Sequence, residues 1–236
     1  MVNTAPEWLL LFDIDGTLLR TNGAGRESTR RAMLDVYGTE GNLASFHFGG
    51  RTDWQIVLDL LEDSPYSEDE IVARLPLYHD SIAQHLSDLI ATFPVEACLG
   101  GVETVRALLE QPNVALGLVT GNVASTAPVK LRAAGYDPDW FPVGAYGHEA
   151  QVRAALPPLA MQRAAALYQS PFAPERVIVI GDTPADVECA RAAGAWAVAV
   201  NTGFEAREDL VNAEPDVLLE DLTGFLEVFP RFTAGD

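Results

Sequence analysis

The 236-residue sequence predicts an α/β fold with a doubly wound parallel sheet that is interrupted by a helical insertion. Near both ends of the chain, short apolar runs alternate with helical patterns, as in sheets built from strand–helix–strand crossovers. Residues 20–96 contain no such run and read as helices only. We therefore expect an α/β core formed by residues 1–19 and 97–236, with an inserted helical cap domain at 20–96. Its hinges are expected near Arg20–Asn22 and Phe93–Glu96.

The first expected strand lies in the stretch WLLLFDIDGTLL and ends in two carboxylates. Leu9 to Phe12 form the continuous apolar run that a strand buried on both faces requires. Asp13 and Asp15 follow at once, and the period of two along a strand turns both toward the same side. Two like charges at the end of a core strand indicate a functional site.

The insertion carries helix-start signals of the capping-box type. Thr52 with Gln55, and Ser67 with Glu70, each precede an apolar helical face. A further apolar stripe follows Pro76, which is expected to break or kink the chain before it. The insertion is thus predicted to contain several helices.

The later strands are expected in segments that end in polar motifs. One such strand ends in Thr120-Gly121-Asn122, and another leads into GDTPAD, which contains Asp182 and Asp186. The carboxyl ends of the strands in an open α/β sheet line the ligand crevice, so these motifs should meet Asp13 and Asp15 there. The segments are 114–121, 140–147, 176–182, 196–203 and 216–222.

Carboxylates gathered in one crevice repel one another and raise one another's pKa. A hard divalent cation relieves that repulsion, and a site with oxygen ligands alone suits Mg²⁺. Magnesium held by carboxylates usually takes a phosphate as a further ligand. One aspartate can then attack phosphorus, while its neighbour protonates the leaving group and activates water. The carboxylates concerned are Asp13, Asp15, Asp182 and Asp186.

The motifs DIDGTL, TGN and GDTPAD, in this order, resemble those of the haloacid dehalogenase (HAD) superfamily. The chain is most similar to members of the phosphoglycolate-phosphatase type, which have a HAD-like Rossmannoid core and a helical cap. The resemblance implies an Mg²⁺-dependent phosphatase that hydrolyses a small phosphomonoester through an aspartyl-phosphate. It implies Asp13 as nucleophile and Asp15 as general acid/base. It further implies phosphoryl binding by Thr120, Gly121 and Asn122, and Mg²⁺ binding by Asp13, the Asp15 carbonyl, Asp182 and Asp186.

The cation that stabilises the transition state departs from the family's commonest pattern. The family usually places a lysine, less often an arginine, before the helix that leads to the metal-binding strand. The corresponding segment here has no lysine, and Arg153 is the expected cation. Lys130, the only lysine of the chain, is expected about two helical turns, or ~12 Å, beyond Asn122 and out of reach. Arg51 either binds an anionic part of the substrate or lies in a solvated helix start.

Composition restricts the partners and the setting. A formal net charge of −19 disfavours nucleic acid and anionic membrane surfaces as partners. A small phosphorylated, anionic substrate would need a local positive site. Met1–Glu7 is short and polar, no apolar run approaches the ~20 residues of a membrane helix, and Cys98 and Cys189 have no metal-type spacing. We expect a cytoplasmic monomer or small homo-oligomer.

Other functions remain to be distinguished. A sugar phosphomutase would use the same residues but would have to retain the phosphoryl group. A haloacid dehalogenase is disfavoured because members of that type typically lack the aspartate that Asp15 supplies. A phospho-receiver module is about half this length, lacks a cap and has no use for Asp15. A non-catalytic binding protein would be expected to have lost a motif residue, and none of the aspartates is missing.

Overall fold

The computed structural model describes residues 5–233, and the central feature is a sheet of six parallel strands in the order β5-β4-β1-β6-β7-β8. All six strands lie within the segments expected from the sequence. Their bounds are β1 Trp8–Phe12, β4 Val114–Thr120, β5 Val143–Tyr146, β6 Val177–Gly181, β7 Trp196–Val200 and β8 Val217–Leu219.

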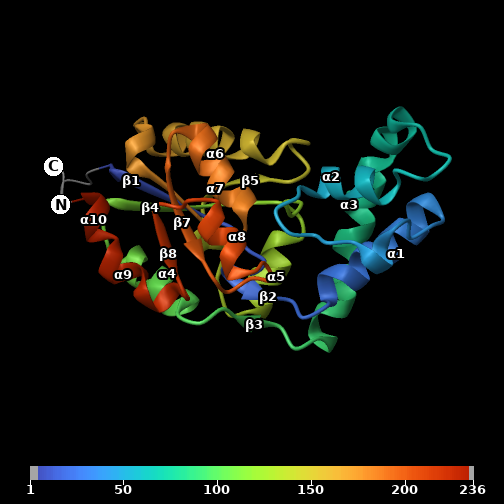
Figure 1. The fold of residues 1–236 in the computed structure, drawn as a ribbon, viewed down its shortest axis with the longest axis horizontal. Coiled ribbons are helices and arrows are strands. Elements are labelled where there is room, and N and C mark those ends of the chain that lie inside the picture. The colour runs from blue at the N-terminus through green and yellow to red at the C-terminus, as the bar shows by residue number, and fades with distance from the viewer. Residues whose placement is uncertain (1–4, 234–236) are drawn as a thin grey trace.

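Two layers of helices cover the sheet (Figure 1). Alternate side chains of β1 enter two separate apolar clusters: Leu9 and Leu11 face one, and Leu10 and Phe12 the other. Such alternation is what a strand buried on both faces requires. One layer contains α6 Leu156–Tyr168, α7 Pro184–Ala193 and α8 Arg207–Asn212. The other contains α4 Gly101–Leu109, α5 Ala127–Ala133 and α9 Phe225–Val228, followed by α10 Pro230–Thr233.

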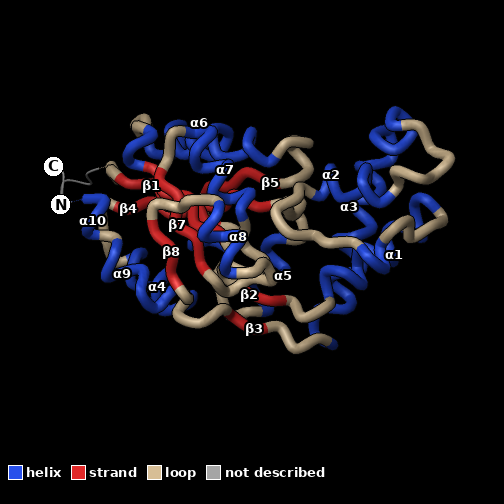
Figure 2. Tube along the Cα trace, in the orientation of Figure 1, coloured by secondary structure: helices blue, strands red, loops and turns tan. Residues whose placement is uncertain are grey.

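A helical segment lies between two short strands, β2 Leu19–Arg20 and β3 Glu96–Ala97, which pair antiparallel. Figure 2 shows these strands where the chain passes between the sheet and the helices on the right of the view. The segment contains α1 Ala24–Tyr37, α2 Asp53–Leu60 and α3 Glu68–Leu89, and has an apolar cluster of its own. That cluster also includes Val123, which follows β4.

Ser67 and Glu70 form the predicted capping box at the start of α3. Thr52 caps α2 through the backbone N–H of Gln55, while the Gln55 side chain bonds Asp59 instead. Of the two effects expected of Pro76, a break or a kink, the break is wrong, because α3 continues through it. A proline inside a helix costs ~3 kcal/mol, and the buried stripe of α3 residues on either side offsets this loss.

Within residues 5–233, no helix is both long enough and apolar enough to cross a membrane. Met1–Thr4, part of the polar start considered above, lie outside the described residues, as do 234–236. Cys98 and Cys189 are buried and not joined in a disulfide.

Candidate active site

The candidate active site lies where β1, β4 and β6 end. Asp13 follows the last residue of β1, is 5% exposed, and donates its backbone N–H to the Ile180 carbonyl of β6 at 2.9 Å. The chain then turns back on itself, because the Gly16 N–H bonds the Leu19 carbonyl at 2.8 Å. Gly16 has a φ of +87°, and a Cβ there would overlap the Asp182 carboxylate. The turn therefore requires glycine.

Three buried carboxylates form one cluster: Asp13, Asp182 and Asp186 each offer an oxygen within 4.8 Å of the others. Burial, followed by the charges of its neighbours, raises the pKa of Asp182 well above its ordinary value. Burial likewise raises the pKa of Asp13 to about 6, although Arg153 opposes the shift. Even with the Arg153 guanidinium beside it, the cluster is thus electrostatically unfavourable when fully ionised. Closely spaced carboxylate oxygens fit Mg²⁺, whose ligands are oxygens.

Asp186 has a second role in this cluster. Its Oδ2 accepts hydrogen bonds from the Thr183 backbone N–H at 3.0 Å and the Thr183 hydroxyl at 2.7 Å, which completes the capping box of α7. Its Oδ1 accepts from Arg153 Nη2 at 2.5 Å. Both oxygens are therefore held by the chain itself. Asp186 lies with the other metal-ligand candidates and also orients the arginine.

Arg153 lies in a 3₁₀ turn, Arg153–Ala155, after β5 and is 8% exposed. Its Nη2 lies 3.2 Å from Asp13 Oδ1 as well as against Asp186. Burial alone would lower the pKa of Arg153, but the carboxylates of Asp186 and Asp13 raise it above its ordinary value. The structure thus brings the expected cation into direct contact with the expected nucleophile.

The Thr120-Gly121-Asn122 turn begins at the last residue of β4. Thr120 is fully buried, and its hydroxyl accepts a hydrogen bond from Asn122 Nδ2 at 2.8 Å. A Cβ at Gly121 would overlap the Arg51 carbonyl oxygen, so a glycine is needed for the helical segment to approach this closely. Asn122 Nδ2 also donates to Asp15 Oδ2 at 2.8 Å, which links this turn to the end of β1.

Lys130 lies inside the site, so the expectation that it is out of reach is wrong. Its Nζ lies 2.6 Å from Asp15 Oδ2 and 2.5 Å from Asn122 Oδ1. The expectation took a helix to start directly after Asn122, whereas the chain turns first and α5 begins only at Ala127. Lys130 is thus only the fourth residue of α5, and its four-carbon stem reaches back to the strand ends.

Two elements of the helical segment touch the turns of the sheet. At the start of α2, the Asp53 N–H donates to the Gly121 carbonyl at 2.8 Å, and its carboxylate accepts from the Val123 N–H at 2.8 Å. Burial raises the pKa of Asp53 to about 6. In the loop before α2, His47 Nε2 lies 3.0 Å from Glu205 Oε1. Sequence reasoning missed Asp53, because an acidic residue in a first helical turn is ordinary.

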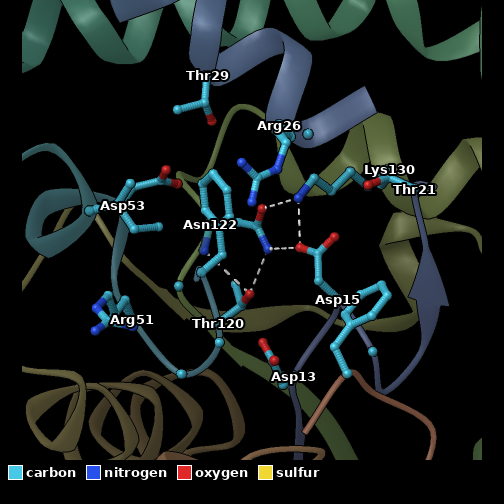
Figure 3. A pocket seen from close by; sticks show the side chains of 18 of the residues that line it. Asp13, Asp15, Thr21, Arg26, Thr29, Arg51, Asp53, Thr120, Asn122 and Lys130 are labelled. Carbon is cyan, nitrogen blue, oxygen red and sulfur yellow. Dashed lines mark hydrogen bonds and ion pairs between the residues drawn. The ribbon is translucent and has the colours of Figure 1, made fainter. Parts of the chain in front are cut away.

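A cavity of about 410 Å³ lies between the sheet and the helical segment. Figure 3 shows Asp13, Asp15 and Thr120 on the sheet side, with Arg26, Thr29 and Asp53 on the side of the helices. Arg51 also lines the cavity, but its Nε bonds Asp59 at 2.9 Å and its Nη1 the His47 carbonyl at 2.8 Å. All the predicted site residues line this cavity except Asp186, which contacts Arg153 but does not line the cavity.

The comparisons with known proteins agree with this geometry. A family profile described as "HAD-hyrolase-like" matches residues 152–225. The chain is 30% identical over 166 residues to a phosphoglycolate phosphatase of Synechococcus elongatus, covering 70% of this chain and 69% of the relative. It is 27% identical over 223 residues to the pyrophosphatase PpaX of Listeria monocytogenes, covering 93% and 94%.

Among solved structures, a haloacid dehalogenase-like family hydrolase from Streptococcus pneumoniae superposes with a TM-score of 0.64 at 20% identity, covering 97% of this chain and 100% of that one. This likeness concerns the fold alone. In the present chain, the carboxylates lie at the carboxyl ends of the strands, as the sequence predicted. With a relative at 30% identity over most of its length and the matching profile, the chain belongs to the HAD-like hydrolase family.

Proposed function

We propose that this protein is an Mg²⁺-dependent phosphatase that hydrolyses a small phosphomonoester through an aspartyl-phosphate on Asp13. The observation that carries the proposal is the position of Asp13, which directly follows β1, belongs to a buried carboxylate cluster and contacts the Arg153 guanidinium. Asp15 lines the same cavity, with 39% of its side chain exposed. A nucleophile, a positioned cation and an accessible acid are the parts that phosphoryl transfer requires.

In this proposal, Asp13 and Asp182 would hold Mg²⁺ together with the Asp15 carbonyl, and Asp186 would complete the cluster. Bound Mg²⁺ would offset the carboxylate charges and polarise a phosphoryl oxygen. Thr17 supports this arrangement, because its hydroxyl donates a hydrogen bond to Asp182 Oδ1 at 2.8 Å and so orients that carboxylate. Such supporting hydrogen bonds orient metal ligands in many sites.

The chain's own groups account for the remaining chemistry. A carboxylate oxygen of Asp13 attacks phosphorus while the bond from phosphorus to the ester oxygen breaks. Asp15 donates its proton to that leaving oxygen, then takes a proton from the water that attacks the aspartyl-phosphate. Phosphate leaves and Asp13 is restored. The Thr120 hydroxyl and the Gly121 and Asn122 N–H groups bind the phosphoryl oxygens, and Arg153 balances the negative charge that spreads over them.

We also propose that residues 20–96 act as a cap domain on a core of 1–19 and 97–236. The hydrogen bond from the Asp53 N–H to the Gly121 carbonyl, the one from the Val123 N–H to the Asp53 carboxylate, and the contact between His47 and Glu205 support a lid closed on the cavity. Closing over the site excludes water during transfer to Asp13, and opening releases product.

The names of the relatives suggest small phosphorylated substrates, among them phosphoglycolate and pyrophosphate. The test is hydrolysis of a panel of phosphoglycolate, pyrophosphate, sugar phosphates and nucleotides, with and without Mg²⁺. We expect Mg²⁺-dependent release of inorganic phosphate from at least one of the phosphomonoesters, and release from pyrophosphate alone would show a phosphoanhydride hydrolase instead. Isomerisation of a sugar phosphate without phosphate release would show a phosphomutase instead, and no reaction with any compound would contradict the proposal.

We expect Arg153→Ala to lower kcat by about 10²–10³, because a preorganised donor to the transferring phosphoryl group is lost. Arg153→Lys should recover part of the activity. Removing Arg153 also leaves two buried carboxylates without their partner, so kcat must be measured where thermal unfolding shows the variant to be folded. Arg163→Ala is a matched control, since it breaks an arginine pair with Glu149 away from the cluster. Equal kcat losses in the two alanine variants would contradict the role of Arg153.

We expect Arg51→Ala to raise KM about tenfold or more while lowering kcat less, if Arg51 leaves Asp59 to bind an anionic part of the substrate. Arg51 lies over the Phe46 ring, 5.3 Å from its centroid. Arg74→Ala is the control, because Arg74 likewise lies over an aromatic ring, 4.6 Å from the Tyr66 centroid, but does not line the cavity. An unchanged KM for every hydrolysed substrate would leave Arg51 with its structural contacts only.

A further inference from the structure

Lys130 is a buried cation that the chemistry described above does not use. It is the only lysine of the chain, and its side chain is 8% exposed. An ammonium removed from water is costly unless hydrogen-bonded acceptors compensate it. Here Asp15 Oδ2 at 2.6 Å and Asn122 Oδ1 at 2.5 Å supply that compensation. Through these two contacts Lys130 can influence the position of Asp15 and Asn122.

The three side chains form a closed triangle of contacts, drawn as dashed lines in Figure 3. Lys130 Nζ contacts both Asp15 and Asn122, and Asn122 Nδ2 donates to the same Asp15 oxygen at 2.8 Å. Asn122 is held in turn by the Thr120 hydroxyl at 2.8 Å. One oxygen of Asp15 therefore receives two donors, which fixes the carboxylate relative to the phosphoryl-binding turn.

The helical segment covers the lysine. A Cβ on Gly25 of α1 would lie 3.7 Å from Lys130 Nζ, so the backbone of α1 passes close to the ammonium. The charge of Lys130 also acts on Asp53 of α2, because it partly offsets the rise in the pKa of the Asp53 carboxyl that burial causes. Lys130 thus lies on the side of the cavity where the helical segment meets the sheet.

The contacts separate Lys130 from Arg153. Arg153 pairs with Asp13 and Asp186, whereas the ion pair of Lys130 is with Asp15. The two cations therefore serve different carboxylates. A change at Arg153 should affect the attack on phosphorus, and a change at Lys130 should affect the step in which Asp15 takes part.

We propose that Lys130 is a positioning residue for Asp15: together with Asn122 it holds the carboxyl group where the leaving oxygen departs. This inference rests on the proposed phosphatase function. It predicts that Lys130 matters in proportion to how much the leaving group needs a proton. An alkoxide needs one as the bond from phosphorus to oxygen breaks, while p-nitrophenolate is a weak base and departs without one.

The experiment compares kcat/KM of wild type and Lys130→Met for glycerol phosphate and for p-nitrophenyl phosphate. This ratio reports the steps up to expulsion of the leaving group. We expect a loss of about 10²-fold with glycerol phosphate, the lower end of a general acid's contribution, and less than tenfold with p-nitrophenyl phosphate. Asp15→Asn should give the same selective loss. In the Asp15→Asn background, Lys130→Met should add no further selectivity.

The controls keep the test decisive. Arg132→Met, on the same helix but exposed, should leave both rates unchanged, and Lys130→Arg should restore part of the loss with glycerol phosphate. If Lys130→Met does not fold, Lys130→Gln is used for the same comparison. Equal losses with both substrates, or no loss with either, would overturn the positioning role. If wild type does not hydrolyse glycerol phosphate, an alkyl phosphate that it does hydrolyse in the panel above takes its place in the comparison. If wild type hydrolyses no phosphate ester with Mg²⁺, the proposed function fails instead.

Discussion

Asp13→Asn is expected to abolish turnover, with a loss of about 10⁴-fold or more, because an amide cannot form the phospho-enzyme. The fold should persist, since asparagine has the same shape as aspartate. Burial raises the pKa of Asp13 to about 6, so the carboxylate carries a desolvation cost at neutral pH that the amide does not. Steady-state hydrolysis and thermal unfolding of the variant test both statements.

Asp15→Asn is the comparison for this prediction. It should retain phosphorylation by an ester with a good leaving group while slowing hydrolysis of the intermediate. Asp13→Asn should show neither step. More than a few per cent of wild-type activity in Asp13→Asn would contradict the assignment of the nucleophile.

Asp182→Ala is expected to lose about 10³-fold or more in kcat/KM, since metal coordination is worth several kcal/mol in the transition state. Excess chelator should abolish wild-type activity, and Mg²⁺ should restore it. A readout independent of activity is the Tm, which Mg²⁺ should raise in wild type by mass action but not in Asp182→Ala.

Asp182 should also make the free energy of unfolding of the metal-free protein depend on pH. The pKa of Asp182 is raised in the folded protein, so the unfavourable contribution of its charge is absent below the unfolded value and grows as pH rises through the folded value. Asp182→Ala should therefore be more stable relative to metal-free wild type at pH 8 than at pH 4.

Asp216→Ala is the control for the Mg²⁺-induced rise in Tm. It removes a carboxylate that is paired with Arg191 away from the cavity, and it should keep this rise. Full activity in chelator would exclude the metal site.

The sheet could be predicted because each of its strands is a short apolar run that is continuous along the chain. The run from Leu9 to Phe12 is buried on both faces, and such a strand leaves a clear pattern. Pro76 misled the prediction because its local cost was weighed without the tertiary packing of α3. In α3, the local sequence predicted where the helix starts, at the Ser67 capping box, but not that the helix continues through a proline.

The motif residues at the strand ends could be predicted because one sheet edge collects them. Lys130 and Asp53 could not, because their roles depend on how the turn after β4 folds back and on how α2 meets it. Neither residue stands in a local pattern that sets it apart from an ordinary helix residue. Contacts between segments distant in the sequence decide both positions, and these contacts appear only in three dimensions.

The central claim is that phosphate passes through Asp13, and acid-quenched enzyme tests it most directly. The protein is mixed with Mg²⁺ and p-nitrophenyl phosphate, quenched during turnover and reduced with borohydride, which converts an aspartyl-phosphate to homoserine. Peptide mass spectrometry should find homoserine at position 13 in wild type and, in larger amount, in Asp15→Asn. Continued turnover with no conversion at position 13, or conversion at another aspartate, would contradict the account.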